Sequence, residues 1–278
     1  MADTTKDMTF LEHLEELRWT LVRSSIAVVS ATLVVFIWIQ DIFEGFIMAP
    51  ARPDFITYRF LCAMGKELGM GEAFCVEDMA FRIQSNTMQG QFMMSFSIAF
   101  TLGLIAASPF VIWQLWRFVA PGLKPAEQAA VRGTILYIIL LFLLGAAFAY
   151  FVVAPMSIQF FATYSLSSIV ENKPTLDSYV GILNSFLLWT GLAFELPVVM
   201  VFLARIGLVG PSFLRQYRKH AFVVILVVAA IITPPDVVSQ ILVTIPLMGL
   251  YELSIALAAR AERRRALASA ETVPAPRR

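Results

Sequence analysis

The stretch 113–127, WQLWRFVAPGLKPAE, separates two long apolar runs, and the rest of the chain is organised around it. Pro121 and Gly122 should end the helix before them, because proline lacks an amide donor and glycine adopts unusual backbone angles at little steric cost. Pro125 suits the first turn of a new helix, where the helix dipole would favour the carboxylate of Glu127. The stretch therefore predicts a tight polar turn between two helices that presents one carboxylate.

Aromatic residues and overall composition indicate where this turn lies. Trp113, Trp116 and Phe118 precede the turn, and such rings gather at membrane surfaces. The 278 residues are 59% hydrophobic and 15% charged, with a mean hydropathy of +0.76, whereas soluble domains are about 45–50% apolar. We therefore predict one integral membrane domain with the turn at its surface. No basic stretch is interleaved with aromatic residues, so a nucleic-acid partner is not expected.

The chain begins with a polar, acidic segment, MADTTKDMTFLEHLEEL, ahead of the first apolar run. A cleavable signal peptide begins instead with a positively charged region, so the first span is expected to remain in the mature protein. Thr9 and Glu12 have the spacing of a capping box, and Leu11, Leu14 and Leu17 then mark one helical face. An amphipathic helix is predicted to lead into the membrane.

Six apolar runs predict an all-α membrane protein with six transmembrane helices. The runs cover approximately residues 19–39, 90–112, 133–153, 179–203, 221–233 and 237–259. The fifth run would span only about 20 Å at 1.5 Å per residue, against a hydrocarbon core of about 30 Å. The last two helices are therefore expected to be short, with a thinned bilayer or sheltering neighbours as alternatives. We expect a membrane domain over residues 1–259 and a disordered cytoplasmic tail over 260–278, which is charged and contains proline.

Lysine and arginine are distributed unevenly between the predicted loops. Of the 21 such residues, 16 lie on the side of the two termini and the central turn; the other five are Arg52, Arg59, Lys66, Arg82 and Lys173. Basic residues concentrate on the cytoplasmic side of membrane proteins. Both termini are therefore predicted to be cytoplasmic.

The two cysteines, Cys62 and Cys75, lie 13 positions apart in the first predicted outer loop. An outer compartment permits disulfides, and a bridge here would stabilise the fold by up to about 3 kcal/mol in the loop-entropy model. Two free thiols are the alternative. Neither histidine, His13 or His220, is near the cysteines in sequence, so no metal site is expected, and no cofactor is expected either.

Glu195 lies well inside the fourth apolar run, in the sequence AFELPVV. An ionised side chain at the middle of a membrane helix costs about 2.5–3.5 kcal/mol on insertion scales. One interpretation is a protonated acid that is hydrogen-bonded to a Ser, Thr or Asn of a neighbouring helix. The other is a contact for a polar residue of a partner helix, aided by a bend at Pro197.

Three motifs occur in order along the chain. They are HLEELR at 13–18, the set Pro109, Gln114, Trp116, Phe118, Pro121, Gly122, Leu123 and Glu127 around the central turn, and TPPD at 233–236. Together they resemble TatC, the twin-arginine translocase subunit, over nearly the whole chain. The resemblance implies a non-enzymatic receptor and core subunit of a multimeric protein translocase in the bacterial cytoplasmic (inner) membrane.

The resemblance also implies roles for particular residues. In this family the glutamate of the HLxELR motif and the glutamate of the central loop bind the Arg-Arg signal peptides of folded precursors, and here they are Glu16 and Glu127. The implied signal-peptide site comprises Glu16, Arg18, Phe118, Pro121 and Glu127. This chain carries an additional acid, Glu15, directly before Glu16, which leaves open which carboxylate binds.

A second implied site docks the single-span partner subunits, which are TatA- and TatB-like. Its residues are Glu195, Thr233 and Gln240. The residues alone support a simpler interpretation of Thr233 and Gln240. The two could form a polar pair in an ordinary helical hairpin near the outer membrane surface.

Two other functions fit parts of the sequence. A proton-coupled small-solute transporter could use Glu195 as its relay, but it predicts interrupted helices in paired halves, which the sequence does not show. An intramembrane protease needs a catalytic pair within the spans, and the sequence has no HExxH motif and no intramembrane Ser-His pair. The receptor interpretation is therefore favoured.

Overall fold

The computed structural model describes residues 10–69, 72, 75–76, 83–119, 134–167, 169, 173–205, 209–233 and 237–271. Within these residues helices account for all the regular structure apart from one isolated bridge, so the predicted all-α architecture is confirmed. In this part of the chain, five helical segments are long and apolar enough to cross a membrane: Leu11–Ile37, Gly90–Val119, Ile135–Thr163, Leu176–Ala204 and Ser239–Arg260. The protein is therefore a multi-pass membrane protein.

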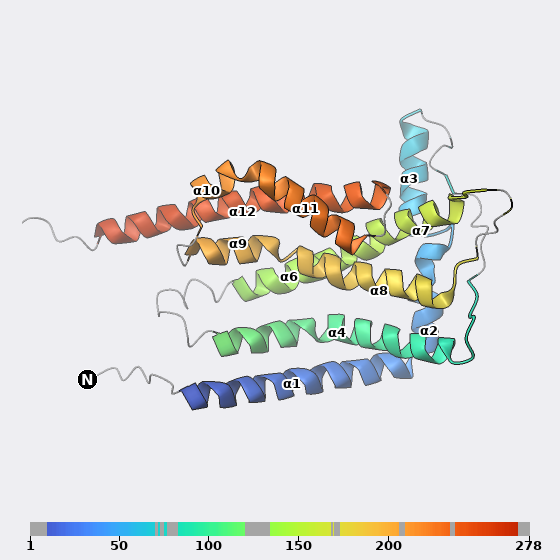
Figure 1. Ribbon diagram of the computed structural model, residues 1–278, viewed down its shortest axis with the longest axis horizontal. Coiled ribbons are helices and arrows are strands. Elements are labelled where there is room, and N and C mark those ends of the chain that lie inside the picture. The colour runs from blue at the N-terminus through green and yellow to red at the C-terminus, as the bar shows by residue number, and fades with distance from the viewer. Residues whose placement is uncertain are drawn as a thin grey trace, which may run out of the picture.

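The long helices lie side by side along the longest axis of the molecule (Figure 1). They are α1 (Phe10–Ile37), α4 (Gly90–Val119), α6 (Thr134–Phe148), α8 (Leu176–Ala193), α9 (Leu196–Arg205), α11 (Arg218–Ile232) and α12 (Val237–Glu271). The shorter elements are α2 (Ile39–Ile42), the π-helix η1 (Phe43–Ile47), the 3-10 helix η2 (Ala49–Ala51), α3 (Ile56–Glu67), the π-helix η4 (Ala149–Val153), α7 (Ala154–Thr163) and α10 (Pro211–Gln216).

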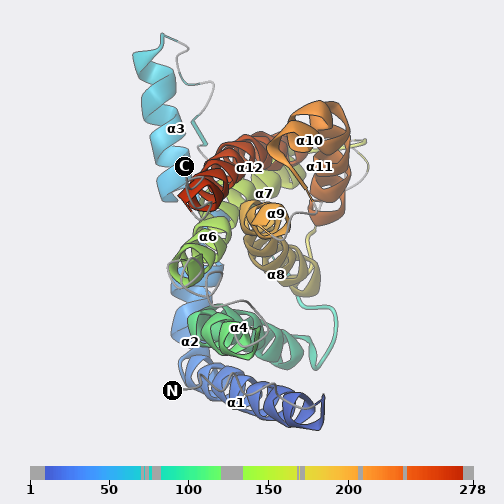
Figure 2. The same ribbon diagram turned by 90° about the vertical axis from the view of Figure 1, so that its left-hand side faces the viewer.

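The two ends of this bundle can be told apart by the helices found there. Helix α1 begins and α12 ends at the same end, which we call the terminal end, and α3 stands across the bundle axis at the opposite end, the α3 end (Figure 1). Viewed from the terminal end, α1 lies at the edge of the bundle and packs mainly along α4 (Figure 2).

Helix α1 packs against α4 through a stripe of small polar residues. Thr20 and Ser24 are buried on this stripe. At the closest approach, a Cβ added to Gly103 of α4 would lie 2.7 Å from the backbone of Thr32, so only glycine fits there. After Arg23 the exposed surface of α1 is mostly apolar, for example at Leu33, which suits contact with lipid. The pairing of α1 with α4 therefore depends on close backbone contact.

Three tyrosines hold the segment 46–50 onto the bundle at the α3 end. Their hydroxyls lie within hydrogen-bonding distance of backbone carbonyls: Tyr58 with Pro50 (3.1 Å) and Pro155 (2.6 Å), Tyr150 with Phe46 (2.7 Å), and Tyr179 with Ile47 (2.6 Å). Burial raises the pKa of the Tyr58 phenol, so this hydroxyl keeps its proton and remains a donor. The chain between α1 and α3 is thereby fixed to η4, α7 and α8.

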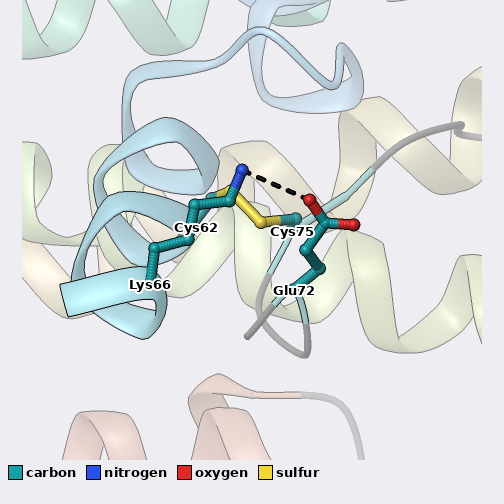
Figure 3. Close-up of a disulfide and its surroundings, with 4 residues drawn as sticks. All are labelled: Cys62, Lys66, Glu72 and Cys75. Carbon is teal, nitrogen blue, oxygen red and sulfur yellow. Dashed lines mark ion pairs between the residues drawn. A yellow bond between two sulfur atoms is a disulfide. The ribbon is translucent and has the colours of Figure 1, made fainter. Parts of the chain in front are cut away.

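Cys62 of α3 is joined to Cys75 by a disulfide, with the two Cα atoms 4.4 Å apart (Figure 3). Lys66 of α3 and Glu72, which both lie between the two cysteines in sequence, form an ion pair in which Nζ and Oε1 are 3.4 Å apart. The bridge ties Cys75 to α3. Of the two alternatives left open by the sequence, the structure therefore contains the bridge.

Further along the chain, Gln84 pairs with the segment that precedes α8. The backbone N–H of Gln84 donates to the backbone carbonyl of Pro174 (3.2 Å), and the backbone carbonyl of Gln84 accepts from the N–H of Leu176 (2.9 Å). This parallel bridge links the two connecting segments at the α3 end. The segments that precede α4 and α8 therefore support each other.

The structure corrects several predicted boundaries. The third apolar helix continues through η4 and α7 to Thr163, beyond the predicted end of the third apolar run at about residue 153. Pro155 is accommodated because it lies in the first turn of α7, where no amide donor is needed. Helix α11 has 15 residues and is short as expected, but α12 has 35 residues and is not.

The tail predicted to be disordered over 260–278 also differs in the structure, because α12 continues as a helix to Glu271. The segment 261–270, AERRRALASA, consists mostly of strong helix formers, and the first proline follows only at position 274. Residues 272–278 lie outside the described part of the chain. High charge alone was therefore a poor reason to expect disorder here.

Candidate functional site

A ring contact joins the beginning of α1 to the end of α4. His13 stacks on Phe118 with the ring centroids 4.4 Å apart and the ring planes 21° apart. The contact forms because the two helices run antiparallel, side by side, so that residues distant in sequence meet at the terminal end (Figure 1). The HLEELR motif and the aromatic edge of the central turn are thereby brought together.

The structure distinguishes the neighbouring acids of this motif. Glu16 follows His13 by three positions, which places both on one face of α1, and both are half-buried. Glu15 and Arg18 are exposed. Glu16 therefore shares the helix face that contacts Phe118, whereas Glu15 does not.

The central turn itself is described only at its edges. Helix α4 ends at Val119 and α6 begins at Thr134, so the turn leaves and re-enters the bundle at the terminal end. Pro121 and Glu127 lie outside the described residues. On the α4 side, the guanidinium of Arg117 lies 5.9 Å from the centroid of the Trp113 ring, a cation–π contact that suits a membrane surface.

Glu195 occupies a break in the fourth membrane-crossing segment. Helix α8 ends at Ala193 and α9 begins at Leu196. The break is explained by Pro197, which lacks the amide that would bond to the carbonyl of Ala193 in a continuous helix. The helix is therefore interrupted next to Pro197, where the sequence predicted a bend, and Glu195 lies at the interruption.

The carboxyl group of Glu195 is shielded from solvent and lies near the backbone of Phe142 on α6. Among the described residues, neither carboxyl oxygen has a hydrogen-bond partner. The adjacent crossing of α6 and α8 is tight, because a Cβ added to Gly145 would lie 2.9 Å from the Cα of Gly191, and one added to Gly191 would lie 2.9 Å from the Phe142 ring. In this part of the chain the acid therefore lacks the hydrogen bond to a Ser, Thr or Asn side chain that the first interpretation required.

Thr233 and Gln240 lie where α11 ends and α12 begins. The Thr233 hydroxyl is buried and donates to the carbonyl of Ala229 (2.9 Å), and Gln240 donates through Nε2 to the carbonyl of Leu226 (3.4 Å). Both donors therefore bond to the backbone of α11. In Figure 1 this junction stops short of the outermost turns of α7 and α8.

The predicted residues thus fall into three separate places. His13, Glu16 and Phe118 gather at the terminal end, Glu195 lies at the α8–α9 break, and Thr233 and Gln240 lie at the α11–α12 junction. Arg18 lies on α1 next to the first group but is exposed. The structure joins neither Thr233 nor Gln240 to Glu195 by a hydrogen bond.

Sequence reasoning missed several polar contacts between helices. They are Asn184 Nδ2 to Ser97 Oγ (2.9 Å) between α8 and α4, the hydroxyls of Ser157 and Ser239 between α7 and α12, and Arg218 Nη2 to Glu252 Oε2 (2.7 Å) between α11 and α12. Such contacts supply much of the specificity of helix packing in a membrane. The available signal was the presence of isolated polar residues within apolar runs.

Comparison with known proteins places the chain in a family. Residues 12–246 match the family described as "Sec-independent protein translocase protein (TatC)". The chain is 36% identical over 256 residues to the TatC protein of Blattabacterium sp. subsp. Periplaneta americana, covering 92% of this chain and 96% of the relative. It is 35% identical over 263 residues to the TatCy protein of Bacillus subtilis, covering 95% of this chain and 93% of the relative.

A solved structure agrees with the sequence comparison. The crystal structure of a "Twin Arginine Translocase Receptor- TatC" matches with a TM-score of 0.67 and 31% identity, and the match covers 90% of this chain and 100% of that one. Sequence and fold therefore agree over nearly the whole length. The family resemblance seen in the three motifs is confirmed, and the chain belongs to the TatC family of Sec-independent protein translocase proteins.

Proposed function

We propose that the protein is a receptor for Arg-Arg signal peptides and the core subunit of a translocase that exports folded proteins. The observation that carries this proposal is the stacking of His13 on Phe118, 4.4 Å between ring centroids. This contact sets Glu16 beside the end of α4, from which the turn carrying Glu127 departs. Two carboxylates on neighbouring segments would then face the same surface.

The chemistry of two such carboxylates suits a pair of arginines. A guanidinium presents a planar fork of donors that pairs with one carboxylate, whereas a lysine ammonium is a compact point charge. In this proposal Glu16 and Glu127 each accept one arginine of the signal peptide. Arg18, Phe118 and Pro121 border the same site.

The orientation in the membrane forms part of the proposal. The terminal end of the bundle is cytoplasmic and the α3 end faces outward, in the bacterial cytoplasmic (inner) membrane. The uneven distribution of lysine and arginine supports this orientation, and a disulfide at the α3 end suits an oxidising outer compartment. Helix α11 is the additional short span, which gives six spans in all, and at about 22 Å it requires a locally thinned bilayer or shelter from α12.

Glu195, Thr233 and Gln240 are proposed to dock the single-span TatA- and TatB-like partners. The unpaired carboxyl of Glu195 supports this assignment, because a buried polar group without a partner favours any helix that supplies one. Gln240 is half-buried and its side-chain amide has only a long bond of 3.4 Å, so it too has hydrogen-bonding capacity left for a partner.

A proton-coupled solute transporter would also use an unpaired membrane carboxyl, but it requires a substrate cavity beside that group. Two cavities, of about 420 and 910 Å³, lie toward the α3 end of the bundle, and Glu195 lines neither. The receptor function is therefore favoured over transport.

Site-specific photo-crosslinking tests the proposed function. A photoreactive residue at position 16 or 127 should crosslink to a precursor that carries an Arg-Arg signal peptide, and a Lys-Lys version of the precursor should abolish the product. The matched negative control places the same photoreactive residue at position 59, where it replaces Arg59, an exposed residue of α3. Crosslinking of equal strength from positions 16, 59 and 127 would contradict the proposal.

A further inference from the structure

Helix α12 carries one exposed face from the apolar span into the charged segment that follows. Leu253 on this face is 46% exposed, and Ala256, Arg260 and Arg263 are also exposed. At about 100° per residue, Leu253 and Ala256 lie within about 40° of Arg260, and Arg263 lies about 60° from it. The face that meets lipid in the membrane is therefore continued by arginines.

The position of these arginines along the helix matches the headgroup layer. The apolar span of α12 ends at Arg260, and α12 continues without interruption beyond the other helices (Figure 1). Arg263 is about 4.5 Å further along the axis. Each headgroup layer is about 5–8 Å thick, since a bilayer measures about 40–45 Å in all around a core of about 30 Å. Both side chains therefore begin at the depth of lipid phosphates.

The charges of this segment are separated around the helix. Glu262 lies about 200° from Arg260, on the opposite face. Arg260 and Arg263 form no ion pair with any described residue, whereas Arg218 at the same end is paired with Glu252 at 2.7 Å. Two unpaired guanidinium groups on a lipid-facing stripe offer bidentate hydrogen bonds to phosphate oxygens.

We propose that Arg260 and Arg263, the basic stripe of α12, bind the headgroup of an anionic phospholipid where α12 leaves the membrane. The binding adds a lipid-recognition surface to the protein and does not depend on the proposed signal-peptide site. A basic segment that attracts anionic lipid only through its charge would bind equally well with lysine in place of arginine. The basic stripe instead binds the headgroup phosphate through guanidinium hydrogen bonds.

Native mass spectrometry of the full-length protein in mild detergent tests this surface. The protein is titrated with phosphatidylglycerol or phosphatidylcholine, and the bound lipid is counted. The wild type should bind phosphatidylglycerol more tightly than phosphatidylcholine, with a preference that falls as salt rises. The double variant Arg260→Gln/Arg263→Gln should lose about fivefold in phosphatidylglycerol affinity for each arginine removed.

Two further variants separate lipid recognition from a general charge effect. Arg260→Lys/Arg263→Lys keeps the charge but loses the bidentate hydrogen bonds, so its affinity for phosphatidylglycerol should fall between those of the wild type and the double glutamine variant, and an affinity equal to the wild type would overturn the proposal. Arg59→Gln removes one exposed positive charge at the α3 end and should change nothing. Equal binding of the two lipids by the wild type, or an equal loss in Arg59→Gln, would overturn the proposal. Melting temperatures of all variants should match the wild type, because the substituted side chains are exposed.

Discussion

Replacing Glu195 by alanine should separate the stability of the protein from its assembly with partners. The carboxyl forms no hydrogen bond with any described residue, so its removal breaks none. A buried polar group without a partner costs about 1–3 kcal/mol, and the methylene lost with it contributes about 0.8 kcal/mol. The unfolding free energy of Glu195→Ala should therefore stay within about 1 kcal/mol of the wild type or rise.

Partner affinity should change in the opposite direction. A hydrogen bond between membrane helices contributes about 0.6–1.7 kcal/mol, which corresponds to a loss of about 3- to 20-fold in affinity for a single-span partner. Glu195→Gln should be milder, because an amide keeps both donor and acceptor capacity. Energy transfer between the labelled protein and a labelled single-span partner in one bilayer measures the affinity, and thermal unfolding in detergent measures the stability.

The control for this experiment is a substitution of Glu252. Glu252→Ala removes the partner of Arg218, an ion pair whose side chains are 43–49% exposed, and it should leave partner affinity unchanged. If Glu195→Ala lowered the melting temperature while partner affinity stayed the same, the carboxyl would be a structural group. The reasoning from its missing hydrogen bond would then be refuted.

Two further predictions concern the fold. Protein isolated without reductant should show no alkylation of Cys62 or Cys75 in mass mapping, because the two are bridged, and two freely alkylated thiols would contradict the structure. Gly103→Ala should destabilise the protein by about 1–3 kcal/mol in thermal unfolding through overpacking, since its Cβ would lie 2.7 Å from the backbone of Thr32. Gly181→Ala, whose Cβ would meet nothing within 4 Å, is the control and should be neutral or stabilising.

The order of the apolar helices could be read from the sequence because each is a continuous run of apolar residues between polar segments, and five of the six predicted runs lie in helical segments long and apolar enough to cross a membrane. Two predicted helix boundaries were wrong, for different reasons. The third run was ended just before Pro155, although a proline in the first turn of a helix breaks no hydrogen bond. The charged segment after Arg260 was taken as disordered, although its alanines and arginines favour helix.

The candidate site was harder to predict from the sequence because it depends on contacts between helices. Composition could place His13 and Phe118 at one membrane surface, but only the packing of α1 on α4 shows that their rings meet. The same packing separates half-buried Glu16 from exposed Glu15, a distinction that two adjacent glutamates cannot reveal in sequence. The interruption of the helix at Glu195 was predictable, since Pro197 causes it locally.

The affinity of the protein for a twin-arginine peptide tests the central claim most directly. At about 1.5–3 kcal/mol for each charge-assisted hydrogen bond, Glu16→Ala and Glu127→Ala should each weaken binding roughly tenfold or more. Glu15→Ala serves as the matched control and should have a smaller effect, because Glu15 is exposed and lies off the face shared by His13 and Glu16.

Measured at two salt concentrations, the Arg-Arg peptide should bind more tightly than its Lys-Lys counterpart and should weaken as salt rises. Glu127→Arg should abolish binding, because it places like charges together. Equal affinity for the two peptides, or no loss in both the Glu16 and the Glu127 variants, would contradict the account.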